Sequence, residues 1–163
     1  MSNKITFSLL FILSSFLWSN CASNKMIKKQ KSNKEVVKLW FEEGWNKDKT
    51  KELVPTCFAP DWEQSDSFLP DQITGHEGMY QLLERFGSAF TEIRFDLTHL
   101  FAEDKLVCVR YSLVAVHTGA FLGVEATNKK ITTTGIAIYE MENNKIKVTW
   151  GEIDFLGLLT QIK

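Results

Sequence analysis

Cysteine is scarce in this chain of 163 residues, and the few cysteines lack the spacing of a metal site. Only Cys21, Cys57 and Cys108 occur. Structural zinc sites need closely spaced pairs of cysteines or histidines, so we expect no metal. The two cysteines after Cys21 leave two alternatives open: a disulfide, which an extracytoplasmic location would permit, or two free buried thiols.

Internal repeats and low-complexity segments are absent as well. The stretch of about 130 residues after Lys34 has the length of one domain and can bury a core by itself. We expect three parts: a signal peptide over residues 1–20, a lipidated cysteine with a basic tether over 21–34, and a folded domain over 35–163.

The apolar run near the N-terminus is too short to span a bilayer comfortably. It extends from Ile5 to Trp18 after one charged residue, Lys4, a pattern that predicts an export signal. The signal ends in Leu17-Trp18-Ser19-Asn20-Cys21, which resembles the lipobox of bacterial lipoproteins. The resemblance implies that Cys21 becomes the lipidated first residue and anchors the protein on the periplasmic or cell-surface side of a membrane. Ordinary secretion after cleavage near Ala22 is the alternative.

Acidic residues are missing from residues 22–34, which carry Lys25, Lys28, Lys29, Lys31 and Lys34. Few apolar groups accompany these lysines, so the segment reads as a disordered tether. Without Lys4 and the tether lysines, 13 basic residues stand against 20 acidic ones, a net charge of about −7. The acidic domain argues against nucleic acid as a partner. The tether either contacts anionic headgroups or is a solvated spacer, and we favour the spacer.

Helical periodicity indicates three helices in the first half of the domain. Ser32 or Asn33 can cap the first helix, and Asp48 can cap a shorter second one. Thr74 opens the third helix with the spacing of a capping box to Glu77. Residues 59–67 read as a short strand or an extended loop. The apolar positions at helical spacing are Val36, Val37, Trp40, Phe41 and Trp45 in the first helix and Met79, Leu82, Leu83, Phe86 and Phe90 in the third.

The pattern changes to strands after the third helix. Apolar and polar residues alternate over Ile93–Ala102, Leu106–Thr118, Lys130–Met141 and Lys145–Phe155, with turn residues between them. Three helices followed by four long antiparallel strands predict an α+β domain with helices on one face of the sheet. A strongly twisted sheet folded around its longest helix would leave a cone with an apolar interior.

The last strand places two carboxylates after a run of apolar residues. If its sides alternate without interruption, Glu152 and Asp154 share the face of Ile146, Val148 and Trp150. An isolated carboxylate on the apolar side must be paired, protonated or facing a cavity, which makes Asp154 the first candidate for chemistry. In the alternative, a bulge or the strand end turns both acids into solvent.

His117 is the second catalytic candidate. Its parity within Leu106–Thr118 puts it on the face of Tyr111 and Leu113, which is the inner face by its apolar character. It would lie near the same cavity as Asp154, where it could polarise a carbonyl or share a proton, unless it is a structural histidine beside the glycine-rich loop. Glu152 and several core aromatics complete the ligand-binding candidates: Trp40, Trp45, Phe86, Tyr111 and Trp150.

Several short motifs occur in one order along the chain. They include Gly75-His76-Glu77-Gly78, Gly135-Ile136-Ala137-Ile138-Tyr139, and Trp150–Asp154 followed by Leu158-Leu159-Thr160-Gln161. In this order and spacing they resemble the SnoaL-like polyketide cyclase family, and the likeness spans Val36–Ile162. The resemblance implies the cone-shaped nuclear transport factor 2-like fold, with three N-terminal helices on a curved, mostly antiparallel sheet, and a possible homodimer through the outer sheet face.

The resemblance also implies a chemistry. In characterised cyclases of this family, an aspartate near the end of the last strand acts as general acid/base without a metal or an organic cofactor, and Asp154 matches it. We expect one of two functions for an exported protein. It is either an enzyme of the cyclase or isomerase type that acts on a hydrophobic small molecule, or a non-catalytic lipoprotein that binds a ligand or a partner.

Overall fold

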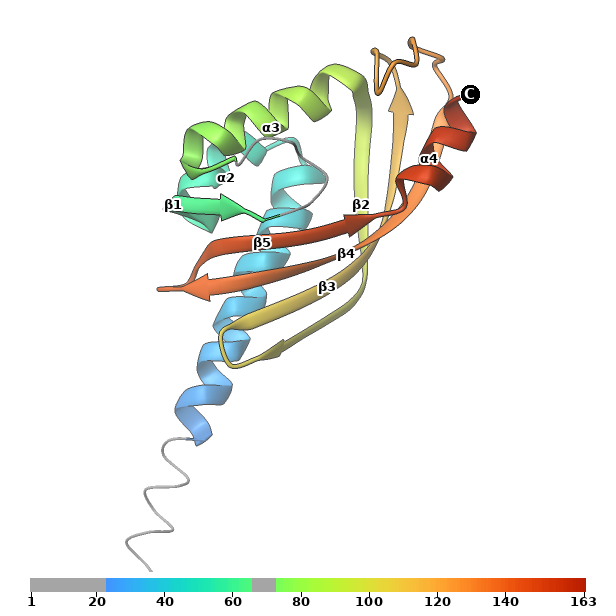
Figure 1. Ribbon diagram of the computed structural model, residues 1–163. Coiled ribbons are helices and arrows are strands. Elements are labelled where there is room, and N and C mark those ends of the chain that lie inside the picture. Colours follow the sequence, from blue (N-terminus) through green and yellow to red (C-terminus); the bar gives the residue numbers. More distant parts are fainter. Residues whose placement is uncertain (1–22, 66–72) are drawn as a thin grey trace, which may run out of the picture.

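The computed structural model describes residues 23–65 and 73–163, which form helices packed against a curved sheet (Figure 1). The helical part begins with residues 23–39 and a π-helical turn, η1 (Trp40–Trp45), and continues with α2 (Thr50–Cys57), α3 (Gly75–Ala89) and α4 (Phe155–Ile162). The strands are β1 (Phe58–Gln64), β2 (Phe90–Glu103), β3 (Leu106–His117), β4 (Lys130–Glu142) and β5 (Lys145–Ile153). The predicted α+β cone is confirmed, with α4 as an additional C-terminal helix. The predicted signal peptide and lipobox lie outside the described residues.

The sheet has the strand order β1-β5-β4-β3-β2. Strands β2 to β5 pair antiparallel, and β1 adds to the edge parallel to β5. The two tight hairpins turn at Asp104 and at Asn143-Asn144, whose φ angles are 49°, 49° and 58°, as turns of this kind require. The alternation in the sequence therefore located all four long strands within a few residues.

The N-terminal helix begins earlier than the sequence pattern indicated. Residues 23–39 are helical, so the prediction of a disordered tether is wrong for residues 23–34. The stretch contains neither glycine nor proline, and lysine, glutamine and methionine favour helix. Its C-terminal part is held by the core, where Val37, Trp40 and Phe41 are buried. Asn33 is consequently a buried residue within the helix and not its cap.

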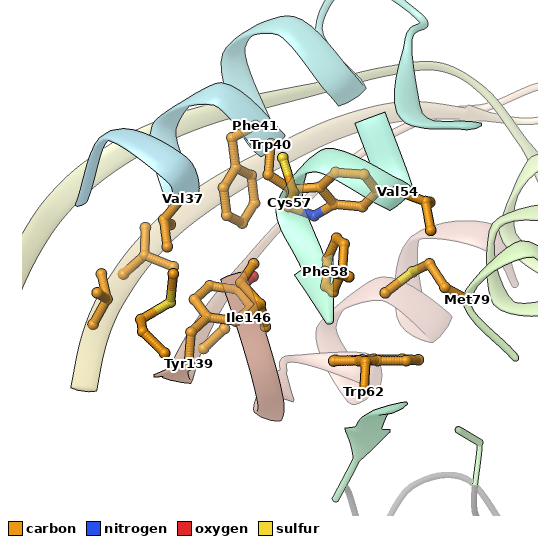
Figure 2. Close-up of a cluster of buried hydrophobic side chains, with 14 of the residues drawn as sticks. Val37, Trp40, Phe41, Val54, Cys57, Phe58, Trp62, Met79, Tyr139 and Ile146 are labelled. Atoms are coloured by element: carbon orange, nitrogen blue, oxygen red, sulfur yellow. The ribbon is translucent and has the colours of Figure 1, made fainter. Parts of the chain in front are cut away.

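The main core lies between the helices and the inner face of β3, β4 and β5. Figure 2 shows Trp40, Phe58 and Trp62 in this cluster, with the Trp40 and Phe58 rings edge to face at a centroid distance of 4.7 Å. Trp62 is fully buried, and its indole Nε1 donates to Thr149 Oγ1 over 2.9 Å. This bond satisfies the one polar group of the indole and ties β1 to the inner face of β5.

Strand β5 contains a one-residue bulge at Lys147. Val148 pairs with Glu140, whereas Ile146 pairs with Met141, so one extra residue lies between these pairs. Because side chains alternate along a strand, the extra residue reverses the faces of everything after it. Thr149 is buried beyond the bulge, as Ile146 is before it, while Trp150 is exposed. The prediction that uninterrupted alternation carries Trp150 to Asp154 inward is wrong, and the bulge alternative is confirmed.

An ion pair fixes the bulged residue to the neighbouring strand. Lys147 Nζ lies 2.6 Å from the Asp61 carboxylate and donates to the Asp61 carbonyl oxygen over 2.7 Å. The hydrogen bond from this ammonium lowers the pKa of the Asp61 carboxyl from its usual value. The charge of the pair is therefore kept at neutral pH and is lost only as the pH falls through the lowered pKa of Asp61.

Cys57 and Cys108 are free thiols, so the disulfide alternative is wrong. Cys57 lies at the end of α2 and is fully buried, and Cys108 is partly exposed on β3. Burial raises the pKa of the Cys57 thiol to about 11. The thiol is therefore protonated at neutral pH, and it is a structural apolar group and not a nucleophile.

Candidate functional site: an aromatic cavity under the sheet

A cavity of about 170 Å³ lies between the inner face of the sheet and the helices. Its space comes from small residues on three neighbouring strands, Ala115, Ala137 and Gly151. The N-terminal helix, α3 and α4 close the other sides with large apolar groups: Trp40, Phe41, Trp45, Met79, Leu82, Phe86, Phe155 and Leu158. A water molecule needs only about 10–15 Å³, so the cavity is large enough for an organic ligand.

The cavity wall is aromatic and carries almost no charge. Ten of its 23 lining residues are aromatic, and none of the described lining residues is a lysine, arginine, histidine or aspartate. The polar groups of the wall are those of Gln64, Thr149, Tyr111 and Tyr139, together with Glu152. Such a wall can bind an apolar body and orient it with a few hydrogen bonds.

Glu152 also lines the cavity. Its side chain is exposed and follows the outward parity of Trp150. Its carbonyl oxygen lies 2.7 Å from the position that a Cβ on Gly135 would occupy. The Tyr111 ring reaches the same position, with Cζ at 2.5 Å. The absence of a side chain at Gly135 thus lets the Tyr111 ring pack against β4 beside the cavity.

Asp154 lies outside the cavity and caps α4. It is exposed, and its Oδ1 accepts a hydrogen bond of 2.8 Å from the Gly157 N–H. Gly157 permits this approach, since a Cβ there would come within 2.7 Å of the Asp154 Cγ. The prediction that Asp154 occupies the apolar face is wrong because the bulge at Lys147 turns it outward. There it borders a shallow hollow of the outer face beside Arg110.

His117 is buried on the inner face, but it does not line the cavity. Its Nδ1 lies 3.1 Å from Thr127 Oγ1, and its ring packs against Phe90 at 5.5 Å. Phe90 belongs to the cavity wall, whereas His117 is not among its lining residues. His117 Nε2 has no hydrogen-bond partner in the described part of the chain. The structure brings neither His117 nor Asp154 into the cavity, where the sequence interpretation had placed them together.

Of the aromatic candidates, Trp40, Trp45, Phe86 and Tyr111 line the cavity, whereas Trp150 does not. Trp150 is 36% exposed on the outer face, opposite Ile138. The prediction that Trp150 lines the cavity is therefore wrong, because the bulge at Lys147 turns Trp150 outward as it does Asp154. Lining residues outside the candidate set include Phe41, Phe58, Phe95 and Phe155. Helical spacing identified Phe41 as an inward residue, and the alternation of β2 could have done so for Phe95.

Two further features were sought among the described residues: a cluster of metal ligands and a membrane-spanning helix. Among residues 23–65 and 73–163, no group of three or more histidine, cysteine, aspartate or glutamate side chains is placed to hold a metal ion. Within the same residues, no helix has the length and apolar character needed to cross a membrane.

The family model described as SnoaL-like polyketide cyclase matches residues 35–162. The chain belongs to this family. A search of curated proteins finds no match.

Solved structures confirm the fold of this SnoaL-like domain. A candidate SnoaL-like polyketide cyclase from Jannaschia sp. CCS1 superposes with a TM-score of 0.75 at 19% identity, covering 82% of this chain and 92% of the other. A candidate polyketide cyclase from Acidithiobacillus ferrooxidans gives 0.73 at 24% identity, covering 80% and 94%. TsrD from Streptomyces laurentii gives 0.72 at 22% identity, covering 81% and 95%. At these identities the likeness shows a common fold and leaves the activity open.

Proposed function

We propose that this SnoaL-like domain binds an uncharged, hydrophobic small molecule in its cavity. The observation that supports the proposal is a cavity of about 170 Å³ whose wall is mostly aromatic and aliphatic. Apolar surface gains about 25 cal/mol for each Å² that leaves water, so a ligand that fills this space has a sufficient driving force. The proposed partner is therefore a small molecule with an apolar body.

The charge of the ligand follows from the wall. A carboxylate or an ammonium in the cavity would lose its water without meeting an opposite charge, which costs several kcal/mol for each ion. The polar wall residues Thr149, Tyr111 and Gln64 are uncharged and supply no such counter-charge. We therefore expect selection for neutral molecules over ions of the same shape.

Three matched probes test this selection: 2-naphthalenemethanol, 2-naphthoate and 2-naphthylmethylammonium. Calorimetric titration of the full chain should give the neutral alcohol a roughly tenfold or larger advantage in Kd over either ion. Ala137→Leu fills the floor of the cavity and should remove binding of the alcohol. If none of the probes binds, the proposed function fails. If the three bind equally, only the charge selection fails.

A charge-insertion variant sharpens the same experiment. Leu82 lines the cavity from α3 and is half-buried, whereas its neighbour Gln81 is exposed. Leu82→Lys should improve the binding of naphthoate relative to the alcohol, because the new ammonium supplies the missing counter-charge. Gln81→Lys adds the same charge outside the cavity and should leave the selection unchanged.

Acid/base catalysis by Asp154 is the second candidate function, favoured by the family match over residues 35–162. Its carboxylate would first have to leave the Gly157 N–H and turn inward. Native mass spectrometry of the chain produced in its source organism, compared with Asp154→Asn, separates the two functions. The same bound species in both samples supports binding alone. An unconverted species in Asp154→Asn would support catalysis.

The proposal includes export and anchoring to a membrane through a lipid on Cys21. It is supported by the short apolar run and the lipobox-like segment that end at this cysteine. Cys21→Ser should move the protein from the membrane fraction to the soluble fraction. Continued retention of Cys21→Ser in the membrane fraction would contradict anchoring by a lipid at this position.

The outer sheet face is the proposed contact of a homodimer. It exposes Ile136, Ile138 and Trp150 at 45%, 38% and 36%. Arg110 and Glu152 flank Ile136 in the strand register, one on each side. A two-fold axis could set each of these charges against the opposite charge of the second copy. Sedimentation equilibrium tests this, and a monomeric mass at high protein concentration would contradict it.

A further inference from the structure

The N-terminal helix has two different parts. From Asn33 onward it packs into the core through Val37, Trp40 and Phe41. Its first turns extend beyond the sheet, as the blue end of the chain in Figure 1 shows, and residues 23–29 are all exposed. The projecting turns therefore contribute little to the fold and are available for contact with another surface.

Charge is concentrated on the projecting turns. Residues 23–34 carry five lysines and no acidic residue, whereas all 20 acidic residues lie from Glu35 onward. The helix thus has a positive end joined to a domain of about −7 net charge. An anionic surface would attract the first turns and repel the domain, which selects one orientation of the molecule.

The projecting turns are also amphipathic. At about 100° per residue, Met26, Gln30 and Ile27 fall in one sector of the helix. Met26 and Ile27 are 49% and 60% exposed, although both are apolar. The remaining sector holds the lysines of these turns: Lys25, Lys28, Lys29 and Lys31. Apolar groups beside a basic face are characteristic of helices that lie in the headgroup region of a bilayer.

We propose that residues 23–31 bind the surface of an anionic phospholipid bilayer. The lysines pair with lipid phosphates, and Met26 and Ile27 enter the headgroup boundary. Because the same helix continues into the core, its contact with the bilayer orients the whole domain and its cavity. The proposal needs a membrane that the chain can reach, and the export proposed above would bring the chain to one. It requires neither a lipid on Cys21 nor a ligand in the cavity.

Vesicle partitioning of the full chain tests the proposal. The quantity measured is the ratio of the partition coefficient on vesicles with phosphatidylglycerol to that on pure phosphatidylcholine vesicles. Any insertion through the apolar run Ile5–Trp18 is common to both vesicles and largely cancels in this ratio. Each lysine near an anionic surface contributes on the order of fivefold. Replacing the four lysines of residues 25–31 by glutamine should therefore lower the ratio by roughly a hundredfold or more.

The matched control removes the same charge from the domain by glutamine substitutions at four exposed lysines: Lys49, Lys51, Lys129 and Lys130. It should change the ratio by less than about threefold. The double variant Met26→Ser and Ile27→Ser should weaken partitioning on both vesicles while leaving the ratio nearly unchanged. Circular dichroism checks that each variant is folded.

Two results would overturn the proposal. One is an unchanged ratio in the helix variant, because the lysines would then not contact lipid. The other is an equal loss in the helix variant and the domain variant, because the attraction would then depend on total charge and not on the projecting turns. Binding of the chain to an acidic protein without a preference for anionic vesicles counts with the first result and assigns the helix to a protein partner.

Discussion

Deletion of Lys147 is expected to destabilise this domain strongly. Without the bulge, every later residue of β5 changes faces. Thr149, Gly151 and Ile153 would turn outward, and the hydrogen bond from Trp62 to Thr149 would be lost. Trp150, Glu152 and Asp154 would turn inward, where an unpaired carboxylate is costly.

A shift of the N-terminal part of β5, in place of its C-terminal part, would destabilise the domain to a similar degree. If the strand slid from its N-terminal end, Ile146 would leave the core, where it is fully buried. Removal of a large buried side chain costs about 2–5 kcal/mol, out of a total stability of roughly 5–15 kcal/mol. Whichever part of β5 shifts, the domain therefore loses a large fraction of its free energy of unfolding.

Lys147→Ala is the control that distinguishes the effect of the bulge from the effect of the Lys147 side chain. This variant keeps the extra residue and loses the ion pair with Asp61. Asp61 is 74% exposed, and ion pairs that are open to solvent contribute little, so the urea midpoint of Lys147→Ala should lie close to that of the parent. The urea midpoint of the deletion variant, followed by circular dichroism, should lie far below that of the parent. A deletion variant that unfolds at the parent midpoint would show that the register of β5 is not fixed by the bulge.

The bulge also explains where sequence reasoning succeeded and where it failed. Strands β3 and β4 follow their alternation closely enough that their inner residues, such as Tyr111 and Ala137, were identifiable from parity. In β5 one extra residue reversed the parity, and the sequence Lys145-Ile146-Lys147-Val148 carries no glycine or proline to indicate it. A bulge depends on the pairing with β4 and β1, which is a non-local property.

The N-terminal helix shows a different reason for failure. Its composition is compatible with both a disordered tether and a helix, because lysine favours helix while a lack of apolar groups removes the usual cause of folding. The helix forms because Val37, Trp40 and Phe41 anchor its C-terminal end in the core. The first turns then extend an existing helix and need no separate nucleation. The sequence showed these anchors but gave no means to extend the helix back to residue 23.

Asp154, which the resemblance matches to a catalytic aspartate, has a structural role in this chain. Asp154 and Gly157 form a cap in which the carboxylate accepts from the backbone of α4 and the glycine leaves room for it. The cap orients α4, whose Leu158 closes one end of the cavity. The resemblance matches Asp154 to a catalytic residue, whereas in the structure its carboxylate caps α4 on the outer side of the sheet.

Gly135→Ala is expected to reduce both stability and ligand binding. The new Cβ would lie 2.5 Å from Tyr111 Cζ and 2.7 Å from the Glu152 carbonyl oxygen, and real Cβ atoms do not approach other atoms so closely. The phenol must then swing off β4 towards the cavity, since the backbone of β5 is held by its pairing with β4. Overpacking of this kind costs about 1–3 kcal/mol. The binding of 2-naphthalenemethanol should fall because the displaced ring occupies the same space.

The matched control is Gly87→Ala. Gly87 lies exposed in α3, and a Cβ there meets nothing within 4 Å. Alanine is the better helix former, so Gly87→Ala should stabilise the domain by about 0.5–1 kcal/mol and leave ligand binding unchanged. Replacement of glycine by alanine is thus expected to lower the stability at position 135 and to raise it at position 87. If Gly135→Ala resembled Gly87→Ala in both measurements, the close packing of Tyr111 over β4 would not limit the cavity, and the ligand would have to bind elsewhere.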